Sequence, residues 1–160
     1  MAPFWKNSRG EWFVIGQFVL FGLIAFGPRT LPGLPYWPPF LRPLGTLLGG
    51  LLIGAGLLLA GAAVFNLGRN LTPFVCPRAQ ATLVTGGAYR LVRHPIYSGL
   101  IFAAAGFTLI VQGWLTAVYA LLLITLLDRK SRREERLLRQ LLPGYAEYSN
   151  KVKRLIPFVY

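Results

Sequence analysis

The stretch PIYSGLIFAAAGFTLIVQGWLTAVYALLLITLL, residues 95–127, carries no charge and decides the fold of this chain. As one helix from Tyr97 to Leu127 it would be about 46 Å long, well over the roughly 30 Å of hydrocarbon in a bilayer. Divided at Gln-Gly-Trp, residues 112–114, it gives two short membrane helices joined by a tight turn. We predict this hairpin, with spans at about residues 96–111 and 114–128.

Two further uncharged stretches, residues 12–28 and 43–68, precede the hairpin. Each meets or approaches the ~20 apolar residues that a membrane-crossing helix needs, which predicts spans at about residues 12–28 and 44–66. Basic residues come before the first stretch, as in a signal peptide, but no small-residue cleavage site follows, so we expect it to be retained. The prediction is one all-α domain, residues 1–160, polytopic, with about four transmembrane helices.

Glycines in the second stretch are spaced for close helix packing. They form Gly45-x3-Gly49 and Gly50-x3-Gly54, and small residues four apart let a neighbouring helix approach closely. The same spacing is common by chance in apolar helices. A packing face and a chance pattern both remain open.

The charge of the loops predicts the orientation of the spans. The chain has 17 lysines and arginines against five acidic residues, a formal net charge of +12. With four spans, every basic residue except Arg29 and Arg42 falls on one side of the membrane, whereas three spans would divide them more evenly. Because lysine and arginine are retained on the cytoplasmic side, we expect four spans with both termini cytoplasmic.

Composition excludes several classes of protein. Apolar residues make up 54% of the chain and charged residues 14%, too few charges for an ordinary soluble domain. The basic residues are explained by an anionic membrane surface, so we do not expect nucleic acid as a partner. With one cysteine, Cys76, and one histidine, His94, we expect neither an internal disulfide nor a structural zinc site, and no metal.

The loops differ in their chemistry. Residues 28–43 are rich in proline, with aromatic residues, and should form an extended crossing at the outer interface without catalytic groups. Polar groups concentrate instead in residues 66–97 and in residues 128–142, which have the pattern of an amphipathic helix at the membrane surface. Pro143 and Gly144 end that helix. Any chemistry therefore comes from these two polar segments.

The first candidate cluster is Arg93-His94-Pro95-x-Tyr97, at the start of the third span. Proline suits the first turn of a helix, and the positive end of that helix beside Arg93 and His94 suits an anion such as a carboxylate. In the alternative interpretation, Arg93 reaches lipid phosphates and His94 merely caps the helix.

The second candidate cluster is Glu134-Glu135, adjacent acids in the most basic segment of the chain. In the simplest interpretation they form surface ion pairs with basic residues three or four positions away on the same helix. This spacing alone does not indicate a function. The order of all the motifs along the chain is more informative.

Together these motifs resemble those of the isoprenylcysteine carboxyl methyltransferase family and the related phospholipid methyltransferases. The matching runs are ATLVTGGAY (residues 81–89), RHPIYSG (93–99), EExxL (134–138), YxxY (145–148) and IPF (156–158). Each run is weak alone, but their order and separation are specific, and the resemblance covers about residues 66–160. It implies a small integral membrane enzyme that uses S-adenosyl-L-methionine to methylate a lipid-like or prenylated substrate.

The resemblance also implies roles for individual residues, with the 66–97 loop folded against the 128–142 helix. The adenosine would lie along Thr82, Leu83 and Val84 and be closed by Tyr89, while Arg93, His94, Pro95 and Tyr97 would form the cofactor signature and Glu134 the acidic contact. The cofactor's ammonium and hydroxyl groups need a carboxylate, and its own carboxylate needs cations or N–H donors. The implied set supplies both.

Near the substrate the sequence departs from the family. One helical turn before Glu134 the carboxyl methyltransferases have an arginine, where this chain has Lys130, with Arg133 nearby. Lysine lacks the planar two-pronged geometry that suits a carboxylate. Few side chains could serve as a base, so we expect an acceptor that is already nucleophilic, a carboxylate or an amine on a long apolar chain. Lys130 or Arg133 would position it if it is anionic.

Two other functions compete with this one. Membrane sterol-type reductases share the Arg-His-Pro-x-Tyr run and use a nicotinamide cofactor, NADPH, but they are larger and lack the paired glutamates. A non-catalytic membrane binding or assembly protein could also be built on the same scaffold. Binding of S-adenosylhomocysteine would distinguish the three.

Overall fold

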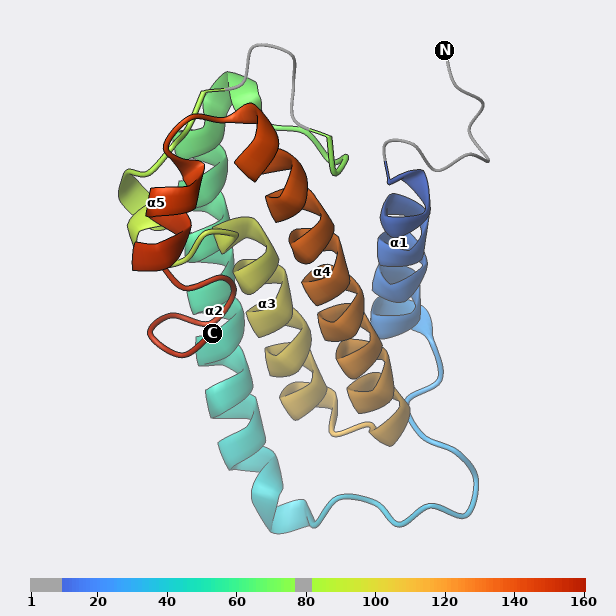
Figure 1. Ribbon diagram of the computed structural model, residues 1–160. Helices are drawn as coiled ribbons and strands as arrows, with labels where there is room; N and C mark the ends of the chain where they lie inside the picture. Colours follow the sequence, from blue (N-terminus) through green and yellow to red (C-terminus); the bar gives the residue numbers. More distant parts are fainter. Residues whose placement is uncertain (1–9, 77–81) are drawn as a thin grey trace.

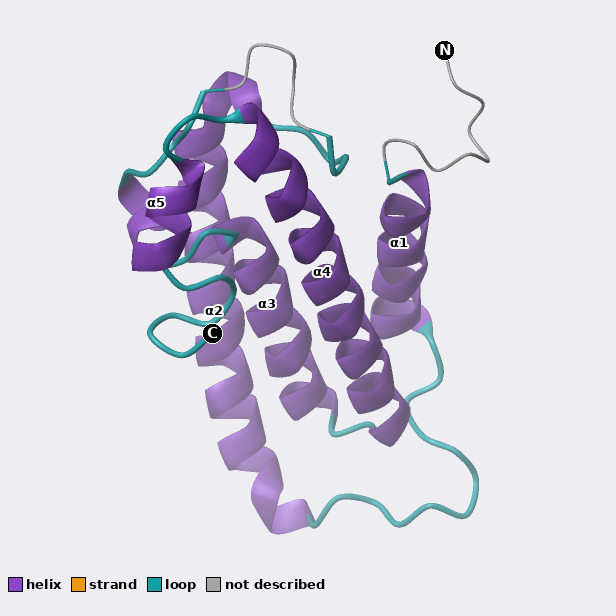
Figure 2. Cartoon of the chain, in the orientation of Figure 1, coloured by secondary structure: helices purple, strands orange, loops and turns teal. Residues whose placement is uncertain are grey.

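The computed structural model describes residues 10–76 and 82–160, and within these ranges all regular structure is helical (Figure 2). This confirms the prediction of an all-α chain. The basic residues Lys6 and Arg9, and the part of the polar loop at residues 77–81, lie outside the described residues.

In the described part of the chain, four long helices are followed by a short one near the C-terminus. The helices are α1 Glu11–Phe26, α2 Arg42–Leu67, α3 Pro95–Val111, α4 Trp114–Leu141 and α5 Tyr145–Lys151, with short 3₁₀ turns at η2 Pro39–Leu41, η3 Gly68–Asn70 and η4 Gly87–Arg90. The long helices stand side by side in the order α2, α3, α4, α1 (Figure 1). Helix α2 packs closely on α3, and α1 packs on α4.

The hairpin predicted from residues 95–127 is present, and its turn lies where the sequence indicates. Helix α3 ends just before Gln112, which adopts the left-handed conformation (φ 50°), and α4 begins at Trp114. A Cβ on Gly113 would lie 2.5 Å from the carbonyl oxygen of Arg29, so only glycine fits there. The backbone N–H of Leu115 donates to the same carbonyl at 3.0 Å, which ties the proline-rich loop at residues 28–43 to the hairpin.

Glycines bring α2 and α3 into close contact. Gly49 faces Gly106 and Gly56 faces Gly99, and a Cβ on any of the four would clash with the backbone carbonyl opposite. The first predicted glycine motif, which also contains Gly45, therefore forms a packing face. The second motif faces open space.

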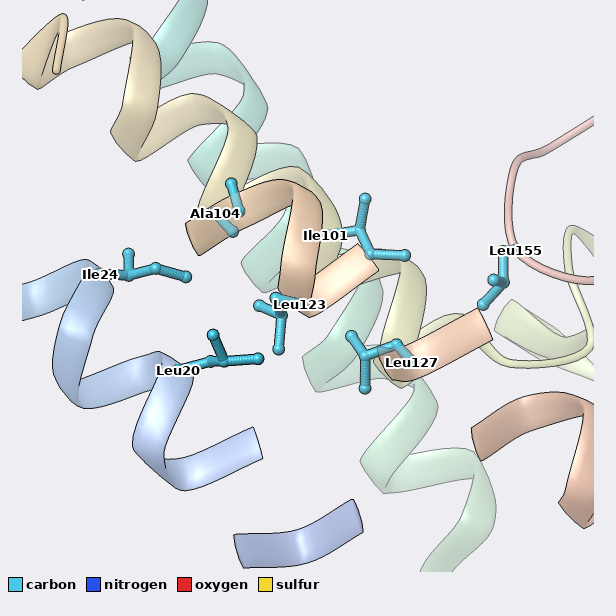
Figure 3. Close-up of a cluster of buried hydrophobic side chains, with 8 residues drawn as sticks. Leu20, Ile24, Ile101, Ala104, Leu123, Leu127 and Leu155 are labelled. Atoms are coloured by element: carbon cyan, nitrogen blue, oxygen red, sulfur yellow. The ribbon is translucent and has the colours of Figure 1, made fainter. Parts of the chain in front are cut away.

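Helices α1, α3 and α4 meet in an apolar core (Figure 3). Leu123 and Leu127 of α4 are fully buried there and cluster with Leu20 of α1 and Ile101 of α3. Leu155, from the segment after α5, joins the same cluster. Close packing of these side chains fixes α1 and the C-terminal segment against the hairpin.

The amphipathic segment at residues 128–142 is helical as predicted, but the prediction of a separate helix is wrong. Helix α4 runs unbroken from Trp114 to Leu141, so the basic segment continues the axis of the apolar one (Figure 1). The physical reason is local: this stretch contains no glycine or proline, and Arg132 bridges to Asp128 at 2.8 Å across one helical turn.

Within the described residues, one helical segment, Pro39–Asn70, is long and apolar enough to cross a membrane by length and composition. Helix α1 and helix α3 are apolar but shorter. Large apolar side chains lie on the outside of the bundle, among them Leu58 and Phe65, which are 78% and 89% exposed. Such a surface suits contact with lipid. The number of four spans stays a prediction.

Candidate functional site

A cavity of about 340 Å³ lies at the end of the bundle where α4 carries its charges. Val14, Gln17 and Phe18 of α1 form part of its wall, and the rest comes from the loop after α2, the start of α3 and the charged part of α4. The wall is mostly apolar, with a few polar groups that converge on the cavity. This size and lining are typical of small-molecule sites.

The structure brings most of the predicted site residues to this cavity. Its wall includes Thr82, Leu83, Val84, Tyr89, Arg93, His94, Tyr97, Lys130 and Glu134. Pro95 is not part of the wall and is buried in the first turn of α3. Arg133 is not part of it either, and its guanidinium lies 6.0 Å from the ring centre of Phe13. The two polar segments of the sequence therefore meet, while the role of each residue stays a prediction.

The C-terminal segment fixes the start of α3. The backbone N–H groups of Arg93 and His94 donate to the carbonyls of Lys153 and Arg154, at 2.8 and 3.1 Å. Pro95 follows as the first residue of the helix, where its missing N–H loses no hydrogen bond. The two side chains that precede the helix thus have fixed positions.

Glu135 of α4 completes this arrangement. Its carboxylate accepts two hydrogen bonds from the Arg93 guanidinium, at 2.7 and 3.1 Å, and lies 3.2 Å from Nε2 of His94. The third nitrogen of Arg93 donates to the carbonyls of Ser149 and Val152. Burial acts to raise the pKa of Glu135, but hydrogen bonds from His94 and Arg93 outweigh it and lower the pKa to about 2. All three guanidinium nitrogens of Arg93 are engaged within the protein.

Glu134, one residue earlier, faces the cavity. It accepts a hydrogen bond from the Tyr97 hydroxyl at 2.9 Å, and Nδ1 of His94 lies 3.7 Å from its carboxylate. Burial raises the pKa of Glu134 above its ordinary value, although His94, Tyr97 and Lys130 act to lower it. Among the described residues no guanidinium pairs with this carboxylate, so it can accept hydrogen bonds from a ligand.

The His94 ring lies between the two carboxylates. It stacks on Tyr97 with the ring planes 1° apart and the ring centres at 5.3 Å. His94 occupies the N-cap position of α3, but its side chain makes no capping hydrogen bond. The alternative interpretation of the first cluster is therefore wrong: Arg93 turns inward to Glu135, and the His94 side chain does not cap the helix.

Lys130 is a buried cation in the cavity wall, with 2% of its surface exposed. Its ammonium donates to the side-chain oxygen of Gln17 at 3.0 Å and lies 5.2 Å from the ring centre of Tyr97. Burial lowers the pKa of Lys130, and the nearby Glu134 opposes that shift. A contact between α1 and α4 thus places a positive charge beside the cavity.

The opposite wall is held by amide and hydroxyl contacts. The Asn70 side chain donates to the carbonyl and hydroxyl oxygens of Thr82, at 3.1 and 3.2 Å. The Tyr148 hydroxyl donates to the Tyr89 carbonyl at 2.6 Å. These contacts fix the backbone on either side of Leu83 and Val84.

Several wall residues are missed by the sequence reasoning, among them Gln17, Asn70 and Tyr145. Gln17 has a readable signal, because it is an amide within the otherwise apolar stretch at residues 12–28. For Asn70 the only signal in the sequence is its position in the polar loop. Tyr145 lies in the run that resembles the family, and its hydroxyl is buried without a hydrogen-bond partner in the described part of the chain.

Comparisons of sequence identify relatives. Residues 48–140 match the model of the isoprenylcysteine carboxyl methyltransferase (ICMT) family. The chain is 30% identical over 154 residues to the cobalt-zinc-cadmium resistance protein CzcN of Cupriavidus metallidurans, covering 95% of this chain and 64% of that protein. It is 33% identical over 116 residues to a probable protein-S-isoprenylcysteine O-methyltransferase of Oryza sativa subsp. indica, covering 70% and 61%. The chain spans about three fifths of the length of these relatives.

A solved structure shares the fold. It is that of the eukaryotic intramembrane Ras methyltransferase ICMT without a monobody, with a TM-score of 0.67 and 22% identity, covering 99% of this chain and 54% of the other. The family match covers more than half of the sequence and includes both the start of α3 and Glu134. The chain is therefore an integral membrane protein of the isoprenylcysteine carboxyl methyltransferase family.

Proposed function

We propose that this chain transfers a methyl group from S-adenosyl-L-methionine to a carboxylate or an amine on a lipid-like or prenylated acceptor, at the cytoplasmic face of the membrane. The observation that carries the proposal is a mostly apolar cavity with a carboxylate, Glu134, and a buried ammonium, Lys130, in its wall. The carboxylate suits the cofactor's ammonium and hydroxyl groups, and the ammonium suits an anionic acceptor.

The residues of the cavity fit this cofactor. The Tyr145 hydroxyl is buried there without a partner in the described residues, and buried polar groups normally have one. Glu134 would hold the ammonium or the hydroxyl groups, and Thr82, Leu83 and Val84 would lie along the adenosine. When bound, S-adenosyl-L-methionine supplies an electrophilic methyl group on a sulfonium sulfur.

The geometry changes the role expected for Arg93. Because its three guanidinium nitrogens are engaged by Glu135 and by backbone carbonyls, Arg93 would position His94 rather than contact the cofactor. The cofactor's carboxylate would then rely on the positive end of α3.

Methyl transfer mainly needs alignment and a desolvated nucleophile. The stacked rings of His94 and Tyr97 hold Glu134 in place, and the contact of Gln17 with Lys130 keeps the ammonium out of bulk water. A carboxylate acceptor is ionised at neutral pH, so no general base is required of the protein.

The acceptor's apolar part would lie against Val14, Phe18 and Leu100, which belong to the cavity wall. An apolar chain is costly to expose to water, so access from within the bilayer is favoured. Activity should rise with acceptor chain length, by up to ~0.8 kcal/mol per buried methylene.

Four membrane spans with both termini cytoplasmic complete the proposal. The support is the position of the charges. Arg93, Lys130 and the basic part of α4 lie at one end of the bundle. Arg29, which follows α1, and Arg42, which begins α2, lie at the other end (Figure 1). The cavity then opens at the cytoplasmic side.

The test incubates the purified protein in nanodiscs with methyl-labelled S-adenosyl-L-methionine and a total membrane lipid extract, and identifies labelled products by mass. We expect a labelled lipid-like product that is lost in Glu134→Ala and retained in Lys151→Ala, a change at an exposed ion pair. Binding of S-adenosylhomocysteine without any methylated product would indicate a non-catalytic binding protein. Absence of both binding and product would contradict the proposal.

A further inference from the structure

Lys130 is a buried ammonium without an ionic partner. It is 2% exposed, and within residues 10–76 and 82–160 no carboxylate oxygen lies within 4.0 Å of its nitrogen. An unpaired charge removed from water is costly. Lys130 borders the cavity, so an anion bound in the cavity would compensate this charge.

Gln17 is the side chain that holds Lys130 in this position. Its amide oxygen accepts a hydrogen bond from the ammonium at 3.0 Å, while the Tyr97 ring lies on another side at 5.2 Å. An ammonium has three N–H donors, and an amide oxygen accepts from it without neutralising its charge. Gln17 therefore orients the cation and leaves both its charge and donors available to a ligand.

The cavity wall thus carries two chemically different groups, one helical turn apart on α4. Glu134 is hydrogen-bonded to Tyr97 and lies near His94, whereas Lys130 contacts α1 through Gln17. A carboxylate at position 17 would form an ion pair with Lys130 and neutralise the positive charge that Gln17 holds beside the cavity. The side chain at position 17 therefore determines whether the part of the cavity beside Lys130 favours an anionic or a cationic acceptor.

We propose that Gln17 determines acceptor specificity: by positioning Lys130 without neutralising it, Gln17 makes the cavity select an acceptor with an anionic group over an amine on the same apolar chain. This inference rests on the proposed function. With a carboxylate acceptor, a C–O bond to the methyl group forms as the methyl–sulfur bond breaks, which yields a neutral methyl ester and S-adenosylhomocysteine. Gln17 is a positioning residue, since it acts through Lys130.

The test compares two acceptors that share one apolar chain, N-acetyl-S-farnesyl-L-cysteine as the carboxylate and S-farnesylcysteamine as the amine. The variants are Gln17→Glu, which keeps the shape and adds a charge, and Gln17→Met, which keeps the size and removes the acceptor atom. Val19→Ala is the control on the same helix, because Val19 is 56% exposed. Each protein is assayed for kcat and KM with both acceptors and for S-adenosylhomocysteine affinity.

For Gln17→Glu we expect kcat/KM with the carboxylate to fall tenfold or more, mainly through KM, and the carboxylate-to-amine ratio to fall with it. Gln17→Met should lower the same ratio less, and Val19→Ala should leave it unchanged. Affinity for S-adenosylhomocysteine should stay within twofold in all variants. If Gln17 had only a structural role, kcat/KM with both acceptors and the affinity for S-adenosylhomocysteine would fall together.

An unchanged acceptor ratio in Gln17→Glu, with S-adenosylhomocysteine binding intact, overturns the inference. If that variant does not fold, the acceptor ratio of Gln17→Met decides: a lower ratio than in the wild type supports the assignment, and an unchanged ratio overturns it. A wild-type protein that binds the carboxylate probe but not S-adenosylhomocysteine would contradict the proposed function, and the effect of Gln17→Met on binding of the two probes would then test Gln17 by itself.

Discussion

Two adjacent carboxylates of α4, Glu134 and Glu135, lie in different surroundings. On one side Glu135 joins Arg93 and the carbonyls of Ser149 and Val152, a set that we call the brace. On the other side Glu134 faces the cavity. Successive residues of a helix point about 100° apart, so neighbouring acids can serve different regions. One carboxylate is committed to the fold, and the other is left for a ligand.

The difference between the two regions is electrostatic as well as geometric. In the brace, hydrogen bonds from His94 and Arg93 overcome the effect of burial and lower the pKa of Glu135 to about 2. In the cavity, burial prevails and raises the pKa of Glu134. In the proposed function, Glu134 is the carboxylate left for a cationic ligand, and the neighbouring ion pair of Glu135 holds the surrounding structure.

The largest effect should come from Glu135→Ala. It leaves the Arg93 guanidinium buried without its carboxylate, and breaking a buried pair in this way costs about 3–5 kcal/mol. Unfolding in detergent, followed by circular dichroism, measures the loss. A change below about 1 kcal/mol would mean that the brace does not stabilise the fold.

The same ion pair predicts a dependence of stability on pH. The folded pKa of Glu135 is about 2, below its ordinary value of 4.5. Its stabilising contribution is therefore fully present above the ordinary value and is lost as the pH falls toward 2. In the Glu135→Ala protein this part of the acid dependence should be absent, which the same unfolding experiment at several acidic pH values can check.

A smaller effect of opposite sign should come from Glu134→Gln. Because the folded pKa of Glu134 is raised, the wild-type protein loses stability as the pH rises above the ordinary carboxyl pKa, until Glu134 ionises in the folded state. The variant has no such loss, so it should be at least as stable as the wild type at pH 7. This expectation already includes the effects of the groups that face position 134, which are His94, Tyr97, Lys130 and Glu135. A marked destabilisation at pH 7 would place Glu134 in the brace.

The smallest effect should come from Lys151→Ala. Lys151 pairs with Glu147 at 2.6 Å on α5, but the two side chains are 70% and 74% exposed. Exposed pairs contribute little, because water and salt screen them. We expect no measurable change in the melting temperature. A clear decrease would show that the exposed pair on α5, and not the buried hydrogen bond from Tyr148 to the Tyr89 carbonyl, limits stability.

Much of the fold follows from the sequence. The uncharged stretch at residues 95–127 is too long for one membrane span, so its length predicts a break, and Gln-Gly-Trp at residues 112–114 indicates where the break lies. The continuity of α4 past Asp128 is missed, because a change from apolar to basic residues is typical of a membrane interface and does not itself end a helix. Helix propensity, which is uniform across this boundary, decides the outcome.

The candidate site is less accessible to sequence reasoning. The resemblance separates Glu134 from Glu135, whereas spacing on one helix cannot, since their partners are distant in sequence: Tyr97 on α3 and Arg93 just before it. Gln17 is missed although it is an amide in an apolar stretch, because the sequence does not indicate which neighbouring helix that side of α1 faces. Only the packing of α1 on α4 determines that rotation.

The most direct test of the central claim is calorimetric titration of S-adenosylhomocysteine into wild-type, Glu134→Gln and Lys151→Ala proteins in the same detergent. A hydrogen bond to a charged group is worth about 1.5–3 kcal/mol, so Glu134→Gln should bind tenfold more weakly or worse, while Lys151→Ala binds like the wild type. Equal affinity of the wild type and Glu134→Gln would contradict the assignment of the cavity-facing carboxylate to the cofactor.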